Sequence, residues 1–411
     1  MKKRLSFALL FALAAAGIAL TGGMHAATIV QSAVSISASP AVTFAGGASS
    51  TGWINFDFYD RKRIFIPAKI NGHDTKVMLA TGLPIPDIDK AFAASIGLQP
   101  KSGSTTPAAS GDYTAGLIAD VHIQIGNMAL PATTASPVDF APLAERIGHS
   151  LPFLLGDDAF NGLVVDIDFA HHRIAFSDPT NLAKPAGVVV VPLTRVEGEH
   201  LVPVSIEGSM PAQFELGLGN AGETLVYQSF YEPHKLLMDR RTSQRLAGGT
   251  GGVFPEVVAT LSRAEFAGVE VGNMPAAFVP TSQTGTKSNL ISGDIGLPVL
   301  ARFHLILDYS HDRLYAAPYT EAARAPFDKD RLGLALNKVD TSIAVGFVAP
   351  NSPAQAAGFK AGDKIMLIDG KSSKAWPQTA LADLRYGAAG TAVAFTMEGG
   401  SIRQVKLTDY F

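Results

Sequence analysis

The sequence contains two stretches of the same kind, Val77-Met78-Leu79-Ala80-Thr81-Gly82-Leu83 and Phe214-Glu215-Leu216-Gly217-Leu218-Gly219-Asn220. Each follows a strand-like run that ends in a short turn, residues 64–72 and residues 201–208. Each stretch therefore predicts a strand that runs into a glycine-containing loop. We call residues 77–83 the first loop and residues 214–220 the second loop.

The surroundings of the two loops form an internal repeat. Short alternating apolar runs with Asn-Gly punctuation, such as residues 54–58 and 63–70, predict strands and hairpins. Four landmarks recur in the same order: Ile70-Asn71-Gly72 with Ile206-Glu207-Gly208, Ile125-Gly126-Asn127-Met128 with Val271-Gly272-Asn273-Met274, Leu155-Gly156-Asp157 with Ser292-Gly293-Asp294, and residues 168–173 with 308–313. The repeated unit is too long for a solenoid repeat. We therefore predict two β-rich units in tandem.

The two loops resemble the active-site loops of the aspartic peptidases, both pepsin-like and retroviral-like, in which two apolar residues precede Asp-Thr/Ser-Gly. The resemblance extends from residue 51 to about residue 320. It implies two β lobes that each donate one loop to a cleft between them. The segments 154–156 and 290–293 sit where this family carries an apolar-apolar-Gly strand beneath the loop. Because both halves lie in one chain, the resemblance implies a monomer in this part.

Both motif aspartates are absent from the chain. The motif positions hold Ala80, Thr81, Gly82 in the first loop and Gly217, Leu218, Gly219 in the second. Aspartic peptidase chemistry needs two close carboxylates that share one proton, so that one acts as base and the other as acid. Alanine and glycine can do neither, so we predict no catalytic residues and a pseudoenzyme. The family's Thr/Ser hydroxyls brace the loops against each other, and with Leu218 in the second loop we expect packing to replace them.

Other catalytic signals in the sequence are few. Asp87, Asp89 and Glu215 are the candidate substitute acids near the loops, but none falls at a motif position. The glycine-rich residues 247–253 lack a following lysine and predict a hairpin rather than a nucleotide site. The histidines fall at predicted turns beside arginine, which favours solvated positions over metal ligation: His171, His172 and His311. We expect no cofactor and no metal.

The C-terminal region has a different pattern. It contains Ser352-Pro353-Ala354, Ala357-Gly358, and a Gly-Asp-x-Ile run ending in Asp369-Gly370, and it resembles a bacterial PDZ domain over nearly all of residues 331–411. The resemblance implies that backbone amides of Leu332-Gly333-Leu334 receive the terminal carboxylate of a peptide. The helix-like residues 379–386 would form the other wall of the groove. The alternative is that the groove contacts the chain's own lobes and binds no free peptide.

Composition and the N-terminal residues concern the cellular location. The chain has 411 residues, 47% of them hydrophobic, enough for two or three domains with full cores. Lys2-Lys3-Arg4 precedes an apolar run over residues 5–20 and small residues up to Ala27, which predicts a signal peptide, with an uncleaved membrane anchor as the alternative. A formal charge of −3 gives no indication of nucleic acid binding. The absence of cysteine excludes disulfides and thiol chemistry, which fits a bacterial periplasmic or secreted protein.

The predicted organisation is mainly β, with an α+β domain at the end. We assign residues 1–26 to a signal peptide, 27–50 to a flexible segment, 51–187 and 188–326 to the two aspartic-peptidase-like lobes, and 327–411 to the PDZ-like domain. We expect an inactive exported protein that binds peptide or protein segments through the interlobe cleft, the PDZ groove or both. The alternatives are an active endopeptidase that uses non-standard acids and an envelope scaffold protein.

Overall fold

The computed structural model describes residues 42–101, 104–108, 111–182, 187–249, 252–284, 289–339 and 341–411. The predicted signal peptide and most of the predicted flexible segment lie outside the described residues. The described end of that segment is not a free lead. It forms strand β1 (Thr43–Phe44), which pairs with β11 (Met128–Ala129) at the edge of the first sheet. Within the described ranges, no helix is long and apolar enough to cross a membrane.

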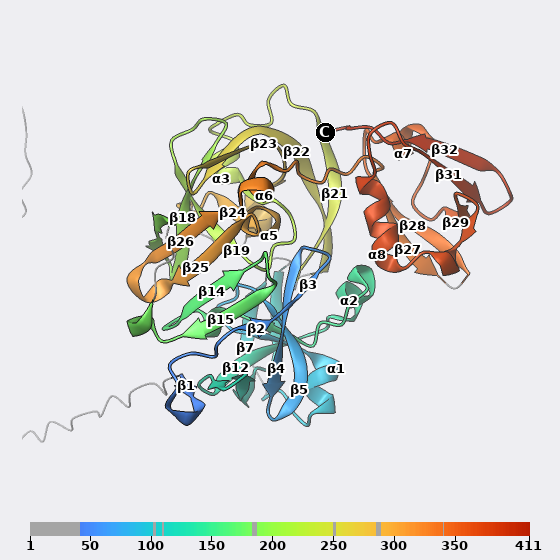
Figure 1. Ribbon diagram of the computed structural model, residues 1–411. Helices are drawn as coiled ribbons and strands as arrows, with labels where there is room; N and C mark the ends of the chain where they lie inside the picture. Colours follow the sequence, from blue (N-terminus) through green and yellow to red (C-terminus); the bar gives the residue numbers. More distant parts are fainter. Residues whose placement is uncertain are drawn as a thin grey trace, which may run out of the picture. The chain divides into compact units, whose positions relative to one another are not determined.

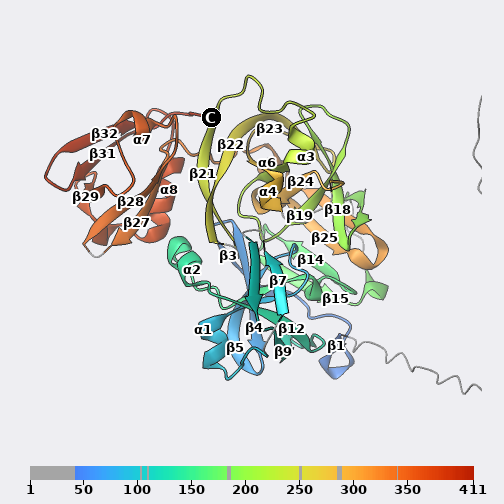
Figure 2. The same ribbon diagram turned by 180° about the vertical axis from the view of Figure 1, so that it is seen from behind.

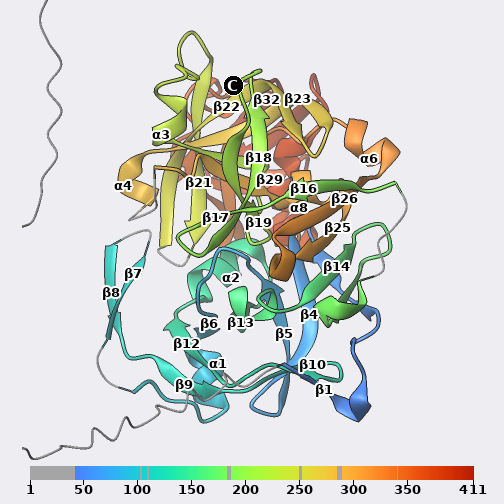
Figure 3. The ribbon, with the colours of Figure 1, turned by 90° about the vertical axis from the view of Figure 1, so that its left-hand side faces the viewer.

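The first β unit is built on a ten-stranded sheet with the strand order β1-β11-β10-β4-β5-β13-β6-β12-β9, and β3 pairs with β4. A separate hairpin, β7 (Ser104–Ala108) and β8 (Gly111–Ala115), is visible in Figure 3. The other elements of this unit are η1 (Ala45–Gly47), β3 (Asp57–Tyr59), β4 (Arg63–Ile70), β5 (His73–Leu79), β6 (Asp87–Asp89), α1 (Lys90–Ser95), β9 (Ile118–Val121), β10 (Ile123–Ile125), β12 (Thr133–Val138), α2 (Ala141–Ile147), β13 (Phe153–Leu155) and η2 (Asp157–Ala159).

The second β unit is built on an eight-stranded sheet with the order β17-β18-β19-β24-β20-β23-β22-β21. Strand β18 also pairs with β22, which closes most of this path on itself. The predicted glycine-rich hairpin is confirmed, because β21 and β22 pair antiparallel on both sides of it (Figure 2). The elements are β17 (Thr194–Val196), β18 (Glu199–Ile206), β19 (Ala212–Gly217), β20 (Thr224–Tyr227), α3 (Gln228–Tyr231), β21 (Thr242–Gly249), β22 (Gly252–Phe266), β23 (Val269–Val279), α4 (Thr281–Thr284), β24 (Gly293–Gly296), α5 (Leu297–Leu300) and α6 (Thr320–Arg324).

The two units share one strand topology around their loops. In the first unit the neighbours β4-β5-β13-β6-β12 pair antiparallel, parallel, antiparallel and parallel in turn. In the second unit β18-β19-β24-β20-β23 pair in the same sequence of directions. The internal repeat is therefore present in the fold, and each loop follows the second strand of its series.

One landmark of the repeat was wrong. Gly126 and Asn127 form the hairpin turn between β10 and β11, whereas Gly272 and Asn273 lie inside strand β23. The turn in the corresponding place of the second unit is Ala267-Gly268, between β22 and β23. The shared letters Gly-Asn-Met therefore do not mark the same hairpin turn in the two units, because such a turn tolerates several residue types.

A third sheet joins the two units, with the order β16-β26-β25-β14-β15-β2. Its central pair is β14 from the first unit against β25 from the second, which lie side by side in Figure 1. One apolar core cluster includes buried residues of both units. The elements are β2 (Ile54–Asn55), β14 (Val164–Asp168), β15 (Arg173–Ser177), η3 (Pro179–Asn181), β16 (Val189–Pro192), β25 (Phe303–Asp308), η4 (Tyr309–His311) and β26 (Arg313–Pro318).

The C-terminal module has its own sheet, β27-β28-β29-β31-β32, with β30 paired to β29, and its own apolar core. The predicted helical wall is confirmed as α8 (Gln378–Asp383) followed by η6 (Leu384–Tyr386). The remaining elements are β27 (Leu334–Val339), β28 (Ser342–Val348), α7 (Pro353–Ala356), β29 (Lys364–Ile368), β30 (Lys371–Ser372), η5 (Ser373–Ala375), β31 (Ala392–Met397) and β32 (Ile402–Lys406). The chain is thus mainly β, as predicted.

Candidate functional site

The first and second loops meet through a buried threonine. The Thr81 hydroxyl donates to the carbonyl oxygen of Leu216 and accepts from the amide of Leu218 at 3.0 Å. The loops also approach closely elsewhere, since a Cβ added to Gly219 would lie 3.0 Å from the Cβ of Ala80. The expectation that packing alone holds the loops was wrong. One hydroxyl suffices because it can both donate and accept, although Leu218 carries none.

The second loop has its side-chain space filled by a neighbouring acid. A Cβ added to Gly217 would overlap the carboxylate of Asp294, which lies on β24 beside β19. Asn220 Nδ2 donates to Asp294 Oδ1 at 2.8 Å and helps to hold it there. The loop pair thus presents the methyl group of Ala80 on one side and a carboxylate from another strand on the other.

The candidate acid Asp87 lies away from the loops. In the sheet register Asp87 pairs with Leu154 on β13, and Leu154 pairs with Met78 on β5. Asp87 therefore lies two strands away from β5, the strand that leads into the first loop, at a distance of about 10 Å. Its side chain is buried, and burial raises its pKa to about 7, against a lowering effect of its hydrogen bond with Ser136.

The other two candidate acids have structural partners. Asp89 caps helix α1 by accepting from the amide of Phe92 at 2.9 Å, and it also accepts from the amide of Phe140 at 3.2 Å. Glu215 accepts from the hydroxyl of Tyr227 at 2.7 Å inside the second unit. Burial, followed by the charges of Glu215 and Asp294, raises the pKa of the Tyr227 hydroxyl well above its usual value. The three predicted acids are therefore not brought together.

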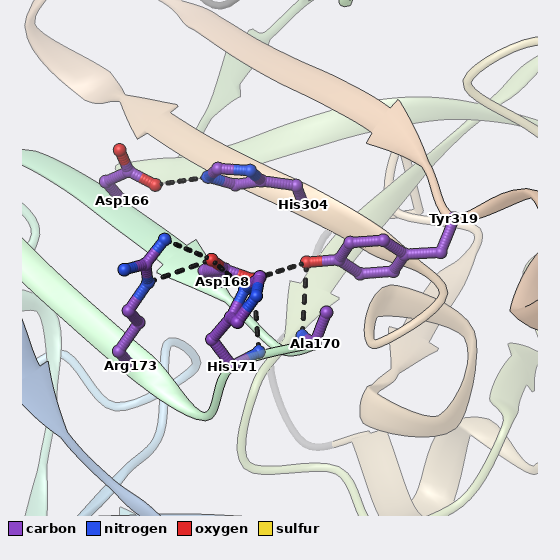
Figure 4. A network of polar contacts seen from close by, with 7 residues as sticks. All are labelled: Asp166, Asp168, Ala170, His171, Arg173, His304 and Tyr319. Atoms are coloured by element: carbon purple, nitrogen blue, oxygen red, sulfur yellow. Dashed lines mark hydrogen bonds and ion pairs between the residues drawn. The ribbon is translucent and has the colours of Figure 1, made fainter.

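The repeated segment at residues 168–173 is a polar junction between the units (Figure 4). Asp168 accepts from Arg173 at 2.9 Å and from the Tyr319 hydroxyl at 3.1 Å, and it contacts His171 at 2.7 Å. Burial alone would raise the pKa of Asp168, but these hydrogen bonds hold it below its usual value. Of the three turn histidines, His171 therefore contributes to the junction, and all three are exposed as expected.

Two further observations complete the junction. His304 on β25 contacts Asp166 on β14 at 2.5 Å, and this contact raises the pKa of His304 despite burial. His311 contacts Asp308 at 2.8 Å, in the same relation as the first-unit pair. In the part of the chain that the structure describes, no group of three or more His, Asp or Glu residues is placed to hold a metal ion.

The second candidate site is the edge of β27 beside α8, which we call the groove because the sequence predicts a peptide groove there. β27 is the edge strand of its sheet and contacts α8 (Figure 1). The groove has an apolar base of residues no more than 6% exposed: Leu332, Leu334, Leu336 and Leu381. The predicted residues Leu332, Gly333 and Leu334 lead directly into β27, and we call them the amide loop. Gly333 has φ +79°, and a Cβ there would overlap Ser352, so only glycine fits.

The amide loop already holds a carboxylate of the chain. Asp330 Oδ1 accepts from the amide of Leu332 at 2.9 Å and from the amide of Gly333 at 2.7 Å. Burial raises the pKa of Asp330, against the lowering effects of Arg385, of the two amides and of a hydrogen bond with Tyr410. The role of Asp330 was not predicted from the sequence. An Asp side chain that accepts hydrogen bonds from the amides two and three residues later is a recognisable local pattern, and this pattern could have indicated the role of Asp330.

The groove is also tied across its width. Gln378 Nε2 on α8 donates to the carbonyl oxygen of Leu336 on β27 at 2.9 Å. The outer side of α8 lies against the first unit, since a Cβ added to Gly148 would lie 3.2 Å from the Cβ of Gln378. Helix α8 therefore contacts the first β unit through Gln378, the residue that also reaches the edge of β27.

The C-terminal residues contact the second unit. Tyr410 and Phe411 form an apolar cluster with Val258 and Ala277 of strands β22 and β23. The Thr260 hydroxyl donates to the backbone oxygen of Phe411 at 3.0 Å. Tyr410 therefore connects the carboxylate in the amide loop with the surface of the second unit.

A cavity of about 630 Å³ lies beside α6 and is lined by several cationic side chains. Three of those charges have partners within the protein. Arg302 donates to the carbonyl oxygen of Ala325 at 2.7 Å and stacks on the Phe327 ring at 3.6 Å, Arg331 binds Asp409 at 2.6 Å, and Lys329 lies 3.9 Å from Asp409. The cavity therefore lies at a junction between elements.

Comparison with known proteins agrees with the geometry of the groove. Residues 325–398 match the PDZ domain family. No curated protein matches the chain in a sequence comparison. PDZ domains typically bind peptide segments, often C-termini. The chain therefore contains a PDZ domain at residues 325–398, preceded by a β-rich region.

Proposed function

We propose that this protein binds extended peptide segments in the groove between β27 and α8. The observation that carries the proposal is that β27 is an edge strand, with an apolar base below it and a helix beside it. A peptide can add to such an edge as a further strand, with backbone hydrogen bonds for affinity and the apolar base for side-chain selection. Binding through the groove does not depend on the acids missing from the two loops.

For the β-rich region we propose a pair of aspartic-peptidase-like lobes that lack the family's chemistry. The sequence resemblance of the loops, the repeated strand topology and the Thr81 bridge between the loops support this proposal. The shared-proton mechanism has no pair of carboxylates at Ala80 and Gly217. An interlobe cleft could still hold an extended chain, because backbone pairing does not require the acids.

We also propose that the protein is exported to the periplasm or secreted. The support is the basic start, the apolar run over residues 5–20 and the absence of cysteine. Detection of the processed chain in a periplasmic fraction of a bacterial host, starting near residue 27, is the expected result. A chain that stays in the cytoplasm with Met1 intact would contradict this part of the proposal.

Residual peptidase activity is the second candidate function, and two observations favour testing it. Asp294 reaches the space next to Gly217, and Asp87 has a pKa near 7. However, Asp87 lies about two strands from the loop, and a displacement of about 1 Å can already cost on the order of a hundredfold in rate. We therefore expect no turnover.

The test of the proposed function is one incubation with two readouts. The full mature chain is mixed with a diverse peptide library from acid to neutral pH, and mass spectrometry records both retained and cleaved peptides. We expect retention without cleavage, and loss of retention in Gly333→Val, because a Cβ at this position overlaps Ser352 and would displace the start of β27. Cleavage that disappears in Asp294→Asn or Asp87→Asn would overturn the pseudoenzyme reading.

The third candidate, a scaffold for another envelope protein, gives a different result in the same experiment. It would show neither retention nor cleavage of peptides, with an intact partner protein recovered from an envelope extract. Ser50→Ala serves as a control variant, because this side chain lies at the edge of the first unit and outside both candidate sites.

A further inference from the structure

The amide loop of the PDZ domain is occupied by the chain itself. Two successive amides that point at one acceptor form an anion-binding concavity, which is the feature that receives a peptide's terminal carboxylate. Here Asp330 Oδ1 already accepts from the amides of Leu332 and Gly333, at 2.9 and 2.7 Å. Each backbone N–H provides one donor, so a second carboxylate cannot use these amides while Asp330 remains.

Asp330 is held by more than the loop. The Tyr410 hydroxyl forms a further hydrogen bond with it, and Arg385 lies close enough to interact with its charge. Tyr410 is itself buried in the cluster with Val258 and Ala277 of the second unit. Removal of Asp330 from the loop would therefore break three hydrogen bonds and disturb a packed junction. A terminal carboxylate that entered beside Asp330 would meet a like charge in a partly desolvated place, which is unfavourable.

The contact at the other end of the groove is weaker. Gln378 donates a single neutral hydrogen bond to the carbonyl oxygen of Leu336, and its side chain is partly exposed. Rotation of that side chain would free the carbonyl oxygen for the amide of an incoming strand, exchanging one neutral hydrogen bond for another. The edge of β27 can therefore open to a strand much more easily than the amide loop can open to a carboxylate.

From this difference we infer that the groove binds internal segments of partner chains, in extended conformation and without a free terminal carboxylate, and that Asp330 sets this specificity. The inference rests on the proposed function, since it requires that the groove binds peptides. It names the class of ligand: β27 pairs with a backbone strand, Leu334, Leu336 and Leu381 select apolar side chains, and Asp330 excludes C-termini.

The test compares each peptide with its C-terminally amidated copy. Peptides retained by the full chain are synthesised as free acid and as amide, and the Kd of each form is measured by fluorescence anisotropy. We expect the two forms to bind the wild-type protein within about twofold. In Asp330→Ala the two amides become available, and we expect the free acid to bind about tenfold more tightly than the amide. In Asp330→Asn the side-chain oxygen still accepts from the amides, so the ratio should stay near that of the wild type.

Matched variants separate the outcomes. Gln378→Ala should lower the Kd of the free-acid and the amidated peptide by a similar factor, so that the ratio of the two Kd values stays the same. The variant removes a competitor for the Leu336 carbonyl oxygen and leaves the amide loop unchanged. Asp328→Asn, an exposed acid in the same segment, should change nothing and controls for net charge. If Asp330→Ala does not fold, the ratio of the two Kd values measured for the wild type and for Gln378→Ala still tests the inference.

Three results have distinct meanings. A wild-type preference of about tenfold or more for the free acid overturns the inference about Asp330 but leaves the proposed function standing. An Asp330→Ala protein that folds and keeps equal affinity for both forms also overturns it. Absence of binding by either form to any variant contradicts the proposed function itself.

Discussion

The loop pair of the β-rich region and the amide loop of the PDZ domain each contain a carboxylate of the chain where an active or binding group would be expected. In the loop pair, Asp294 fills the space that a side chain at position 217 would need. In the amide loop, Asp330 accepts the hydrogen bonds that a ligand would need. In the first case position 217 offers no side chain for chemistry, because glycine carries none and Asp294 fills the space. The second only occupies a function, because the amides remain and can exchange partners.

The comparison shows that the absence of a side chain, as at Gly217, differs from the occupation of backbone amides by a carboxylate, as at Gly333. At Gly217 the Asp294 carboxylate occupies the volume that a side chain would need. At Gly333 the backbone still has the φ of +79° that points its amide at an anion. The following variants test this contrast, in order of decreasing expected effect.

The largest effect is expected for Gly217→Asp. The new side chain would overlap the Asp294 carboxylate and place a second negative charge beside it, which should lower the free energy of unfolding by about 4 kcal/mol. Urea unfolding followed by fluorescence measures this. The double variant Gly217→Asp with Asp294→Gly should recover most of the loss, because it vacates the space. A single variant as stable as the wild type would show that Asp294 does not hold this position.

Thr81→Val tests the bridge between the loops and should cost about 2 kcal/mol. Valine keeps the shape but leaves the Leu216 carbonyl and the Leu218 amide buried without their partner. Thr81→Ser retains the hydroxyl and should lose much less, which separates the hydrogen bonds from packing. Equal losses in both variants would mean that the methyl group, rather than the hydroxyl, holds the loops together.

Asp87→Asn should stabilise the protein at neutral and alkaline pH, by an amount of the order of 2 kcal/mol. The folded pKa of about 7 lies above the ordinary value of 3.8, so the folded state binds the proton more tightly. The stability that Asp87 contributes to the wild type is therefore fully present when the pH is below the ordinary pKa of 3.8, and it is lost as the pH rises through about 7. The variant lacks this loss, and thermal unfolding at acid and alkaline pH should show the difference only at the higher pH.

Asp168→Asn is the matched control, because its pKa shift has the opposite sign. The folded pKa of Asp168 is lowered by its hydrogen bonds, so its contribution to stability is present above the ordinary value and is lost as the pH falls through the folded pKa. This variant should be destabilised at neutral pH and match the wild type in strong acid. The same sign for both variants would contradict the assignment of Asp87 as a buried acid without a compensating charge.

The smallest effect is expected for Tyr410→Phe, about 1 kcal/mol, since it removes one hydrogen bond to Asp330 and keeps the ring in the cluster with Val258. The informative measurement is hydrogen exchange at the amides of Leu332 and Gly333, which should become faster as Asp330 is held less firmly. Tyr386→Phe, outside this contact, should leave both amides unchanged. Unchanged exchange in Tyr410→Phe would mean that the loop alone holds Asp330.

Much of the fold was predictable from local sequence. The alternating run at residues 63–70 and the turn that closes it gave β4 and its hairpin with β5, because side-chain period and turn residues act within a few positions. The PDZ landmarks were recognisable for the same reason, and residues 379–386 are helical as expected. The repeated landmark at Gly272 failed because its letters lie inside strand β23, whereas the same letters form a hairpin turn in the first unit, although Asn273 keeps a left-handed φ of +51°.

The positions of the loops along the chain were predictable from the sequence, but the contacts of their side chains were not. The loops and the amide loop lie where the sequence indicated, yet the contact of Thr81 with Leu216 spans 135 residues and depends on how two sheets meet. Asp89 and Glu215 were candidate catalytic acids in the sequence. In the structure Asp89 caps helix α1, and Glu215 accepts a hydrogen bond from the hydroxyl of Tyr227. Such partners come from other elements and leave no mark beside the residue in the sequence.

By itself, the sequence determined that this protein has two β-rich units with a repeated order, a PDZ domain, and loops without the two aspartates that peptidase chemistry requires. Only the tertiary structure decided what stands in their place: the parallel pairing of β24 with β19 brings the Asp294 carboxylate to Gly217. It also showed that Tyr410 ties the carboxylate of Asp330 to a surface of the second unit. The physical reason is that residue type fixes which groups can act, whereas the register and packing of distant strands fix which of them meet.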